Sequence, residues 1–397
     1  MRDVKAVVRP EIQALYEEMV GDRRDFHRHP ELGFFENRTS AVVKKRLEDL
    51  GFETRVMAKT GVLGQLHGEK DAAKTLAFRA DMDALPLQEL GEKEYKSVYP
   101  GCMHACGHDG HTAMLLGFAK FLAAKKEGLA GNIKLLFQPA EEGEGGALPM
   151  IKEGALKDPD VDRLVGLHLW NDFPAGEAGV RGGAIMAAAD EFILTITGKG
   201  GHGAQPQKTV DAISVAGHVI CALNTIVARE TDPLDPTVVT IGQVSGGSNF
   251  NIIAQEVRLR GTVRAVEEKT KDLIQKRIGE IAGGVCQAMG ASCAYEYINQ
   301  YPMTINDDTV ASIVAQQIVD VLGKERLRTD GMSMGAEDMS YYLREVPGCF
   351  FFLGSSNVEL GLDKPHHHPE YDFDERVMPI GVEIFARIAE EFFNRKF

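Results

Sequence analysis

The stretch NIKLLFQPAEEGEGG, residues 132–146, indicates the fold class most clearly. It begins as a short apolar run and becomes a polar cluster at Pro139. The runs TLAFRA (75–80) and RLVGLHL (163–169) are built in the same way, and helical patterns such as residues 111–126 separate them. Strands that alternate with helices predict an α/β domain with a largely parallel sheet. Sites in such sheets form in the loops at the strand C-termini, where these polar clusters lie.

A different pattern follows the first strands. EFILTITGK (191–199) is an expected strand, and residues 209–230 are an expected long amphipathic helix. The strands and helix after them complete the order β-α-β-β-α-β, which is the ferredoxin-like motif. A chain of 397 residues is also long for one ordinary domain. We therefore expect an inserted domain of residues 188–300 within a catalytic domain made of residues 1–187 and 301–397.

Composition and charge argue against several classes of partner. Hydrophobic residues make up 44% and charged residues 26%, as in soluble globular proteins. The net charge of −14 argues against nucleic acid and anionic membranes. No apolar run is expected to reach the roughly 18 residues of a membrane span. The first 32 residues are charged throughout, which predicts an amphipathic helix and no signal peptide. Six cysteines are too few for a disulfide framework, so we expect a cytoplasmic protein.

Residues 101–111, GCMHACGHDGH, combine two cysteines and three histidines with glycines. Cys106 and His108 are of the types that bind zinc and similar divalent ions. A helix is expected to begin near His111, and a helix N-terminus favours the thiolate form of a nearby cysteine. Two other interpretations stay open, namely a redox pair formed by Cys102 and Cys106, and a plain polar loop.

Glu141 and Glu142 are adjacent acids that follow the apolar run of residues 132–138. Neighbouring side chains that leave a strand point in different directions. One carboxylate can therefore bind a metal while the other faces a metal-bound water. Such a water needs a base that takes its proton and returns it to a leaving amine. A solvated acidic turn is the alternative.

Three further segments supply histidines. His168 ends the apolar run 163–169, where a metal ligand or a hydrogen-bonded core residue would fit. PHHHPEYDFDE (365–375) holds three histidines between two prolines, which keep the segment extended. One or more of them facing inward would complete a site, and a surface loop is the alternative. His202 lies in the glycine-rich turn 198–206, where its ring can project with little crowding.

The combination of segments is more specific than any one of them. Nearly the whole chain carries, in one order, RRDFHRHPELGFFE, RADMDALP, MHACGHDGH, QPAEEGEGGA, GLHLW, GKGGHGAQP, GGSNFNII, GAEDMSYY and HHPEYDFDE. This closely resembles the metal-dependent amidohydrolase/aminoacylase branch of the co-catalytic metallopeptidases, which includes hippurate hydrolases, indoleacetyl-amino-acid hydrolases and N-acetyl-diaminopimelate deacetylases. The resemblance implies an α/β catalytic domain with an inserted ferredoxin-like lid that mediates homodimerisation.

The resemblance also implies a centre of two divalent metal ions, with manganese, zinc, nickel or cobalt as the candidates. The Cys106 sulfur would bridge the two ions. His108 and His168 would bind one ion, and Glu142 and His367 the other. His367 is preferred over its neighbours because the ligand of the family lies two residues before the proline.

Catalytic and substrate-binding roles follow from the same resemblance. Glu141 would be the general acid/base. His202 would reach the active site of the partner subunit and polarise the substrate carbonyl. Asn251 and Arg264 would hold the carboxylate of the substrate, a role that suits arginine.

One departure from the wider superfamily narrows the expected activity. Peptidase branches carry a metal-binding histidine where this chain has Arg79, and a bridging aspartate where it has Cys106. Asp81 and Asp83 are then expected to orient ligands. We expect hydrolysis of small N-acyl amino acids with acetyl, benzoyl or similar acyl groups. The alternative is a carboxypeptidase or dipeptidase on the same fold. A degenerate relative that only binds its ligand should lack metal ligands, yet every expected one is present.

Overall fold

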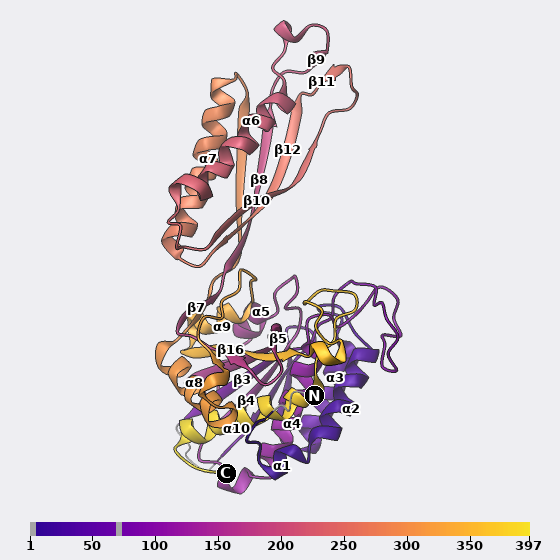
Figure 1. The fold of residues 1–397 in the computed structure, drawn as a ribbon, viewed down its shortest axis with the longest axis vertical. Coiled ribbons are helices and arrows are strands. Elements are labelled where there is room, and N and C mark those ends of the chain that lie inside the picture. Colours follow the sequence, from indigo (N-terminus) through magenta and orange to yellow (C-terminus); the bar gives the residue numbers. More distant parts are fainter. Residues whose placement is uncertain (1–4, 69–73) are drawn as a thin grey trace. The chain divides into compact units, whose positions relative to one another are not determined.

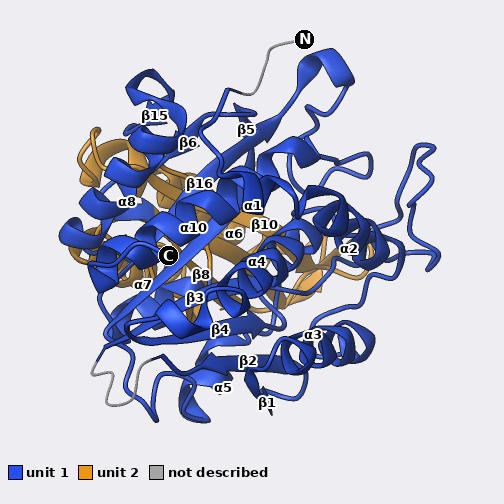
Figure 2. Cartoon of the chain, turned by 90° about the horizontal axis from the view of Figure 1, so that it is seen from below, with its two compact units in different colours: residues 1–185, 305–331, 338–397 blue, residues 186–304, 332–337 orange. Residues whose placement is uncertain are grey.

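The computed structural model describes residues 5–68 and 74–397 and divides the chain into two compact units (Figure 2). The first unit takes residues 1–185, 305–331 and 338–397, and the second takes residues 186–304 and 332–337. The second unit thus extends slightly beyond the insertion expected from the sequence. It also includes residues 332–337, where the chain re-enters this unit for one short segment that sequence patterns did not indicate.

An eight-stranded mixed sheet forms the centre of the first unit (Figure 1). Its four middle strands, β4, β3, β5 and β16, are parallel to one another, whereas β1 and β2 run antiparallel at one edge. The predicted α/β class with a largely parallel sheet is therefore confirmed. In sheet order the strands are β1 (Glu53–Met57), β2 (Gly61–Leu66), β4 (Asn132–Gln138), β3 (Thr75–Asp81), β5 (Arg163–Pro174), β16 (Gly348–Ser356), β6 (Ala178–Gly179) and β15 (Leu327–Arg328).

Helices cover both faces of this sheet, which explains why its middle strands are apolar on both sides. On one face, Phe78 of β3 packs against Phe118 of α4 and Phe385 of α10. On the other face, Met339 of α9 lies against Gly166 of β5. The helices of this unit are α1 (Pro10–Gln13), α2 (Tyr16–Arg28), α3 (Asn37–Asp49), α4 (His108–Ala123), α5 (Ala147–Lys152), α8 (Asp308–Leu322), α9 (Met339–Glu345) and α10 (Met378–Phe393).

The N-terminal region differs from its prediction. Instead of one amphipathic helix over the first 32 residues, the chain forms α1 and α2, separated by a turn at Ala14 and Leu15. Helix α1 begins at Pro10, because proline suits the first turn of a helix, where its missing N–H leaves no hydrogen bond unmade. Residues 1–4 of the predicted helix lie outside the described residues.

The second unit has the predicted order β-α-β-β-α-β. Its antiparallel sheet is ordered β10-β12-β8-β13, and two helices pack on one face. Phe192, Leu194 and Ile196 of β8 point into the core between sheet and helices. The elements are β8 (Ala188–Thr197), α6 (Ala212–Thr225), β10 (Thr237–Gly246), β12 (Glu256–Ala265), α7 (Glu268–Ala288) and β13 (Ser292–Tyr301), with a small ribbon of β9 (Gly201–His202) and β11 (Ile252–Ile253).

Helix α6 corrects one expectation about membranes. With the π-helical turn Ile226–Glu230 that continues it, residues 212–230 are long and apolar enough, by length and composition, to cross a membrane. The expectation that no stretch reaches that length was therefore wrong. Val215, Val219 and Leu223 of this helix pack in the core of the second unit, and 33% of its apolar window is buried.

Candidate metal centre

Five side chains from four separate segments of the first unit meet at one end of the parallel strands. Their donor atoms form two groups, Cys106–His108–His168 and Cys106–Glu142–His367, and within each group all of these atoms lie within 4.8 Å of one another. Cys106 belongs to both groups. The structure thus brings together all five of the expected ligands, and it puts the sulfur where both sets of ligands meet.

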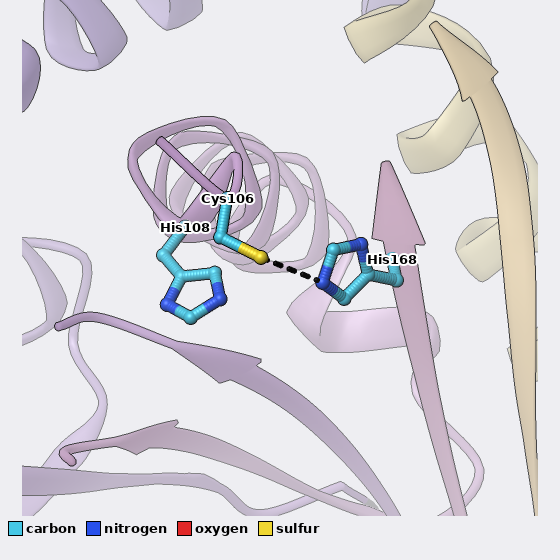
Figure 3. A group of neighbouring side chains, drawn as sticks. All are labelled: Cys106, His108 and His168. Atoms are coloured by element: carbon cyan, nitrogen blue, oxygen red, sulfur yellow. Dashed lines mark hydrogen bonds between the residues drawn. The ribbon is translucent and has the colours of Figure 1, made fainter. Parts of the chain in front are cut away.

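Each expected ligand lies in a strand or in a loop at the C-terminal edge of the sheet. Cys106 and His108 flank the N-terminus of α4, and His168 lies in β5 (Figure 3). Glu142 follows β4, and His367 follows β16. Gly107, between the first two ligands, has φ +92°, and a Cβ there would lie 3.0 Å from the Tyr371 hydroxyl. Glycine is needed at this position because an L side chain would be strained and crowded.

The hydrogen bonds of His108 and His168 leave one nitrogen of each ring for a cation. Nδ1 of His168 lies 2.6 Å from the Leu169 carbonyl oxygen, which can only accept, so Nδ1 carries the proton. Nε2 then accepts a hydrogen bond from the Cys106 thiol at 3.6 Å (Figure 3), a contact that a cation bound by both side chains would replace. Nδ1 of His108 likewise donates to the Asp83 carbonyl oxygen at 2.9 Å. Its Nε2 is buried without a hydrogen-bond partner among the described residues.

Burial and charge make this site unfavourable for a free thiolate. Burial, and then the carboxylates of Glu142 and Glu141, raise the pKa of the Cys106 thiol well above its usual range. The sequence argument that the helix N-terminus would favour the thiolate is therefore outweighed here. A divalent cation reverses the balance, because a coordinated thiol is deprotonated.

The charge around His108 also favours a cation. Burial lowers the pKa of His108, but Asp81, Asp83 and other carboxylates raise it to about 10 overall. A surplus of negative charge therefore surrounds the ring. Soft sulfur, imidazole nitrogen and carboxylate oxygen, with an unpaired buried nitrogen among them, fit a divalent transition metal.

Only one of the three consecutive histidines lies in a ligand group. Nε2 of His367 is 3.1 Å from Glu142 Oε1, and its backbone N–H donates to the Ala105 carbonyl oxygen. His366 is half-buried, and its Nε2 lies 2.9 Å from the Leu169 carbonyl oxygen. Nδ1 of His368 accepts the Glu370 N–H. The geometry agrees with the choice of His367.

Glu141 lies beside the ligands and is 6% exposed. Its carboxylate forms a third close group with His108 and Glu142, again within 4.8 Å. The preceding residue, Ala140, has φ +53°, in the left-handed region that L residues rarely adopt. This turn carries two adjacent carboxylates to the same cluster.

The structure adds His111, a residue for which the sequence analysis proposed no role. Its Nδ1 donates to Asp81 Oδ1 at 2.6 Å, and its Nε2 accepts the Leu169 N–H at 2.8 Å. Both nitrogens are therefore used, and the ring supports the strand end next to His168. The three-residue spacing from His108 on a helix was the signal that could have indicated it.

The contacts of Arg79 and Cys102 argue against a metal ligand at position 79 and against a redox pair of Cys102 and Cys106. Arg79, at the position of the histidine of the peptidase branches, is buried and donates to Asp81 and Asp338. The Cys102 thiol contacts the Pro30 carbonyl oxygen, belongs to none of the ligand groups, and is not bonded to another cysteine. Burial raises the pKa of Cys102 to about 11, which disfavours a redox pair with Cys106.

The remaining predicted residues lie in the second unit. His202 is exposed in β9, and its Nδ1 accepts the Ala204 N–H. The Asn251 carbonyl oxygen accepts the Gly203 N–H, so Asn251 and His202 are neighbours. Asn251 comes shortly before the first residue of β12, Glu256, whereas Arg264 lies near the last one. At the usual rise per residue, Glu256 and Arg264 are about 26 Å apart. One carboxylate cannot contact both Asn251 and Arg264 of a single chain.

Comparison with known proteins agrees with this arrangement. The profile of the group described as Peptidase family M20/M25/M40 matches residues 77–391. IAA-amino acid hydrolase ILR1-like 4 of Arabidopsis thaliana is 39% identical over 94% of this chain and 85% of its own length. Thermostable carboxypeptidase 2 of Saccharolobus solfataricus is 37% identical over 99% and 100%. A solved Bacillus subtilis structure, a dinuclear metal binding peptidase, has 30% identity and a TM-score of 0.84, covering 96% and 99%.

Proposed function

This chain belongs to peptidase family M20/M25/M40, and we propose that it hydrolyses the amide bond of small N-acyl amino acids at a centre of two divalent metal ions. One observation carries the proposal. Two ligand groups share the Cys106 sulfur, and the Glu141 carboxylate lies beside His108 and Glu142, which belong to different groups. A base placed between two cation sites suits the activation of water.

The residues of this chain then divide the chemistry among them. Bound ions would polarise the scissile carbonyl and acidify a water. Glu141 takes the proton from the water that attacks the acyl carbon and gives it to the departing amine nitrogen. General acid–base catalysis of this kind contributes about 10²–10⁴-fold.

His202, Asn251 and Arg264 are assigned to the substrate in the same proposal. The lid forms a homodimer, and the His202 ring of one subunit stabilises the oxyanion in the site of the other. Asn251 and Arg264 bind the substrate carboxylate from different subunits, since they lie at opposite ends of β12. Light scattering on the purified chain tests the dimer, and a monomer would overturn this arrangement.

Metal-stripped protein, reloaded separately with Mn²⁺, Zn²⁺, Co²⁺ and Ni²⁺, gives the direct test of the activity. We expect hydrolysis of N-acetyl- and N-benzoyl-amino acids, with little turnover of the same compounds when the carboxylate is amidated. Glu141→Gln should bind the same metal and remain nearly inactive. If no metal restores hydrolysis of any N-acyl amino acid, the proposed function is wrong.

A carboxypeptidase is the second candidate, because the carboxypeptidase relative is 37% identical along its whole length. Both activities leave a free amino acid with its carboxylate, and they differ in the group on the acyl side. Dipeptides and benzoyl-dipeptides assayed beside the simple N-acyl compounds separate them. Higher kcat/KM on the peptides would favour the carboxypeptidase.

The proposal also keeps a cytoplasmic location, which cell fractionation tests.

A further inference from the structure

The segment PELGFFEN, residues 30–37, belongs to a motif that received no chemical role, yet it contacts the backbone next to the base. Glu36 is fully buried. Its Oε1 accepts the Ala140 N–H at 2.9 Å, and its Oε2 accepts the Thr60 hydroxyl at 2.5 Å. Each carboxylate oxygen therefore has a partner, and one of the two partners is the residue directly before Glu141.

The contact falls on a strained residue. Ala140 has φ +53°, and it is buried. Left to itself, an L residue favours negative φ, so this conformation persists only where neighbours impose it. Gly33, in the same segment as Glu36, leaves the room that the turn needs, because a Cβ there would lie 2.9 Å from the Ala140 Cβ.

A second anchor lies on the other side of the base. The Glu142 N–H donates to Asp83 Oδ2 at 2.9 Å. Glu141 therefore stands between two backbone N–H groups that are each held by a buried carboxylate. Asp83 also contacts His108, so it is tied to the metal ligands, whereas Glu36 contacts none of them among its hydrogen bonds.

We propose that Glu36 is a positioning residue for catalysis, which holds Ala140 in its left-handed conformation and so aims the Glu141 carboxylate at the attacking water. This inference rests on the proposed function, in which Glu141 is the base. Burial, and to a smaller extent the charge of Asp83, raise the pKa of Glu36 to about 7. Glutamine can keep both contacts, because its amide oxygen can accept the Ala140 N–H and its amide N–H can donate to the Thr60 hydroxyl oxygen.

Four variants test the inference in the metal-loaded enzyme. Glu36→Leu removes the acceptor and should lower kcat by about 10²-fold, as expected for a misplaced catalytic group. Metal content and KM should stay near those of the parent. Glu36→Gln should keep most of kcat. Ala140→Gly in the Glu36→Leu background should restore part of kcat, because glycine adopts positive φ without strain. Thr60→Val, the matched control, removes the other partner of Glu36 and should leave kcat nearly unchanged.

Each result decides something. Glu36→Leu with parental kcat overturns the inference, and so does a parallel loss of metal and activity, which would mean a general structural role. If Glu36→Leu fails to fold, Glu36→Ala with and without Ala140→Gly replaces it, and absence of recovery overturns the inference. Failure of the proposed function is distinct, since the parent would then be inactive on N-acyl amino acids or indifferent to Glu141→Gln.

Discussion

Arg23 offers a quantitative test of how the ligand segments are held together. Its guanidinium is fully buried and contacts three carboxylates, at 2.8 Å for Asp109, 2.7 Å for Asp372 and 3.1 Å for Glu375. Asp109 follows the ligand His108, and the other two acids belong to the segment that carries His367. Removal of one partner of a buried ion pair leaves uncompensated buried charge and costs about 3–5 kcal/mol.

Arg23→Met is the perturbation, because methionine keeps a long unbranched apolar side chain but lacks the guanidinium that lies over the rings of Tyr95 and Phe373. Arg24→Met is the matched control: Arg24 is a neighbour in sequence, contacts the same Glu375, and has a side chain 42% exposed. A pair with one partner this exposed to solvent contributes about 0–1 kcal/mol. We expect Arg23→Met to lower the free energy of unfolding by about 3–5 kcal/mol, and Arg24→Met by less than about 1 kcal/mol.

Urea unfolding of the chelated protein, followed by tryptophan fluorescence, measures the difference. Trp170 is the one tryptophan of the chain and lies in β5, so its emission reports on the first unit. With a slope of about 2–3 kcal/mol per molar urea, Arg23→Met should shift the midpoint by about 1–2 M. Equal shifts in the two variants would refute the reasoning, because they would mean that burial of the ion cluster has no energetic consequence.

The same variant has a predicted pH dependence. Burial raises the pKa values of Asp109 and Asp372, but Arg23 and the other cations more than offset it, so both lie below their ordinary range. A depressed carboxyl pKa stabilises the fold above the unfolded pKa, and the stabilisation is lost as pH falls toward the folded pKa. Without Arg23 this contribution weakens. The deficit of Arg23→Met should therefore be fully present at pH 7 and shrink as the pH falls below about 4. A deficit that grows on acidification would contradict the assignment.

Three further predictions concern the centre and the lid. Glu141→Gln should retain its metal, by elemental analysis, and lose about 10²–10⁴-fold in turnover, whereas near-normal turnover would mean that another group is the base. Cys106→Ser should lower the bound metal toward one ion or none, since metal binding needs the deprotonated sulfur ligand. Cys102→Ser should barely change the metal content, and equal losses in the two variants would point to a different ligand set. Homodimers of His202→Ala and of Glu141→Gln should each be nearly inactive. When mixed they should regain activity, because one site of the heterodimer would hold both intact residues. No recovery despite proven heterodimers would exclude a role of His202 across the dimer interface.

Local patterns in the sequence were sufficient to predict the α/β class, and the resemblance to a known family named the five candidate ligands that the structure brings together. Apolar runs at strand length, alternating with helical periods, predict a sheet covered on both faces, and polar clusters at the ends of those runs predict where a site forms. His168 and Glu142 could be named from the order of motifs. Such features depend on residues close together in the chain, so they are visible without coordinates.

Other properties of the site depend on residues far apart in sequence, and only packing brings these together. The pKa of Cys106 is raised because burial and the carboxylates of another loop disfavour the thiolate more than the N-terminus of α4 favours it. His367 lies beside Glu142 while His366 turns toward the Leu169 carbonyl oxygen. The family resemblance had pointed to His367, but only the fold shows the contacts that separate it from its neighbour. The Glu36 contact to Ala140 joins residues 104 positions apart. Desolvation and long-range hydrogen bonds are properties of the folded chain, because they exist only once separate segments exclude water from one another.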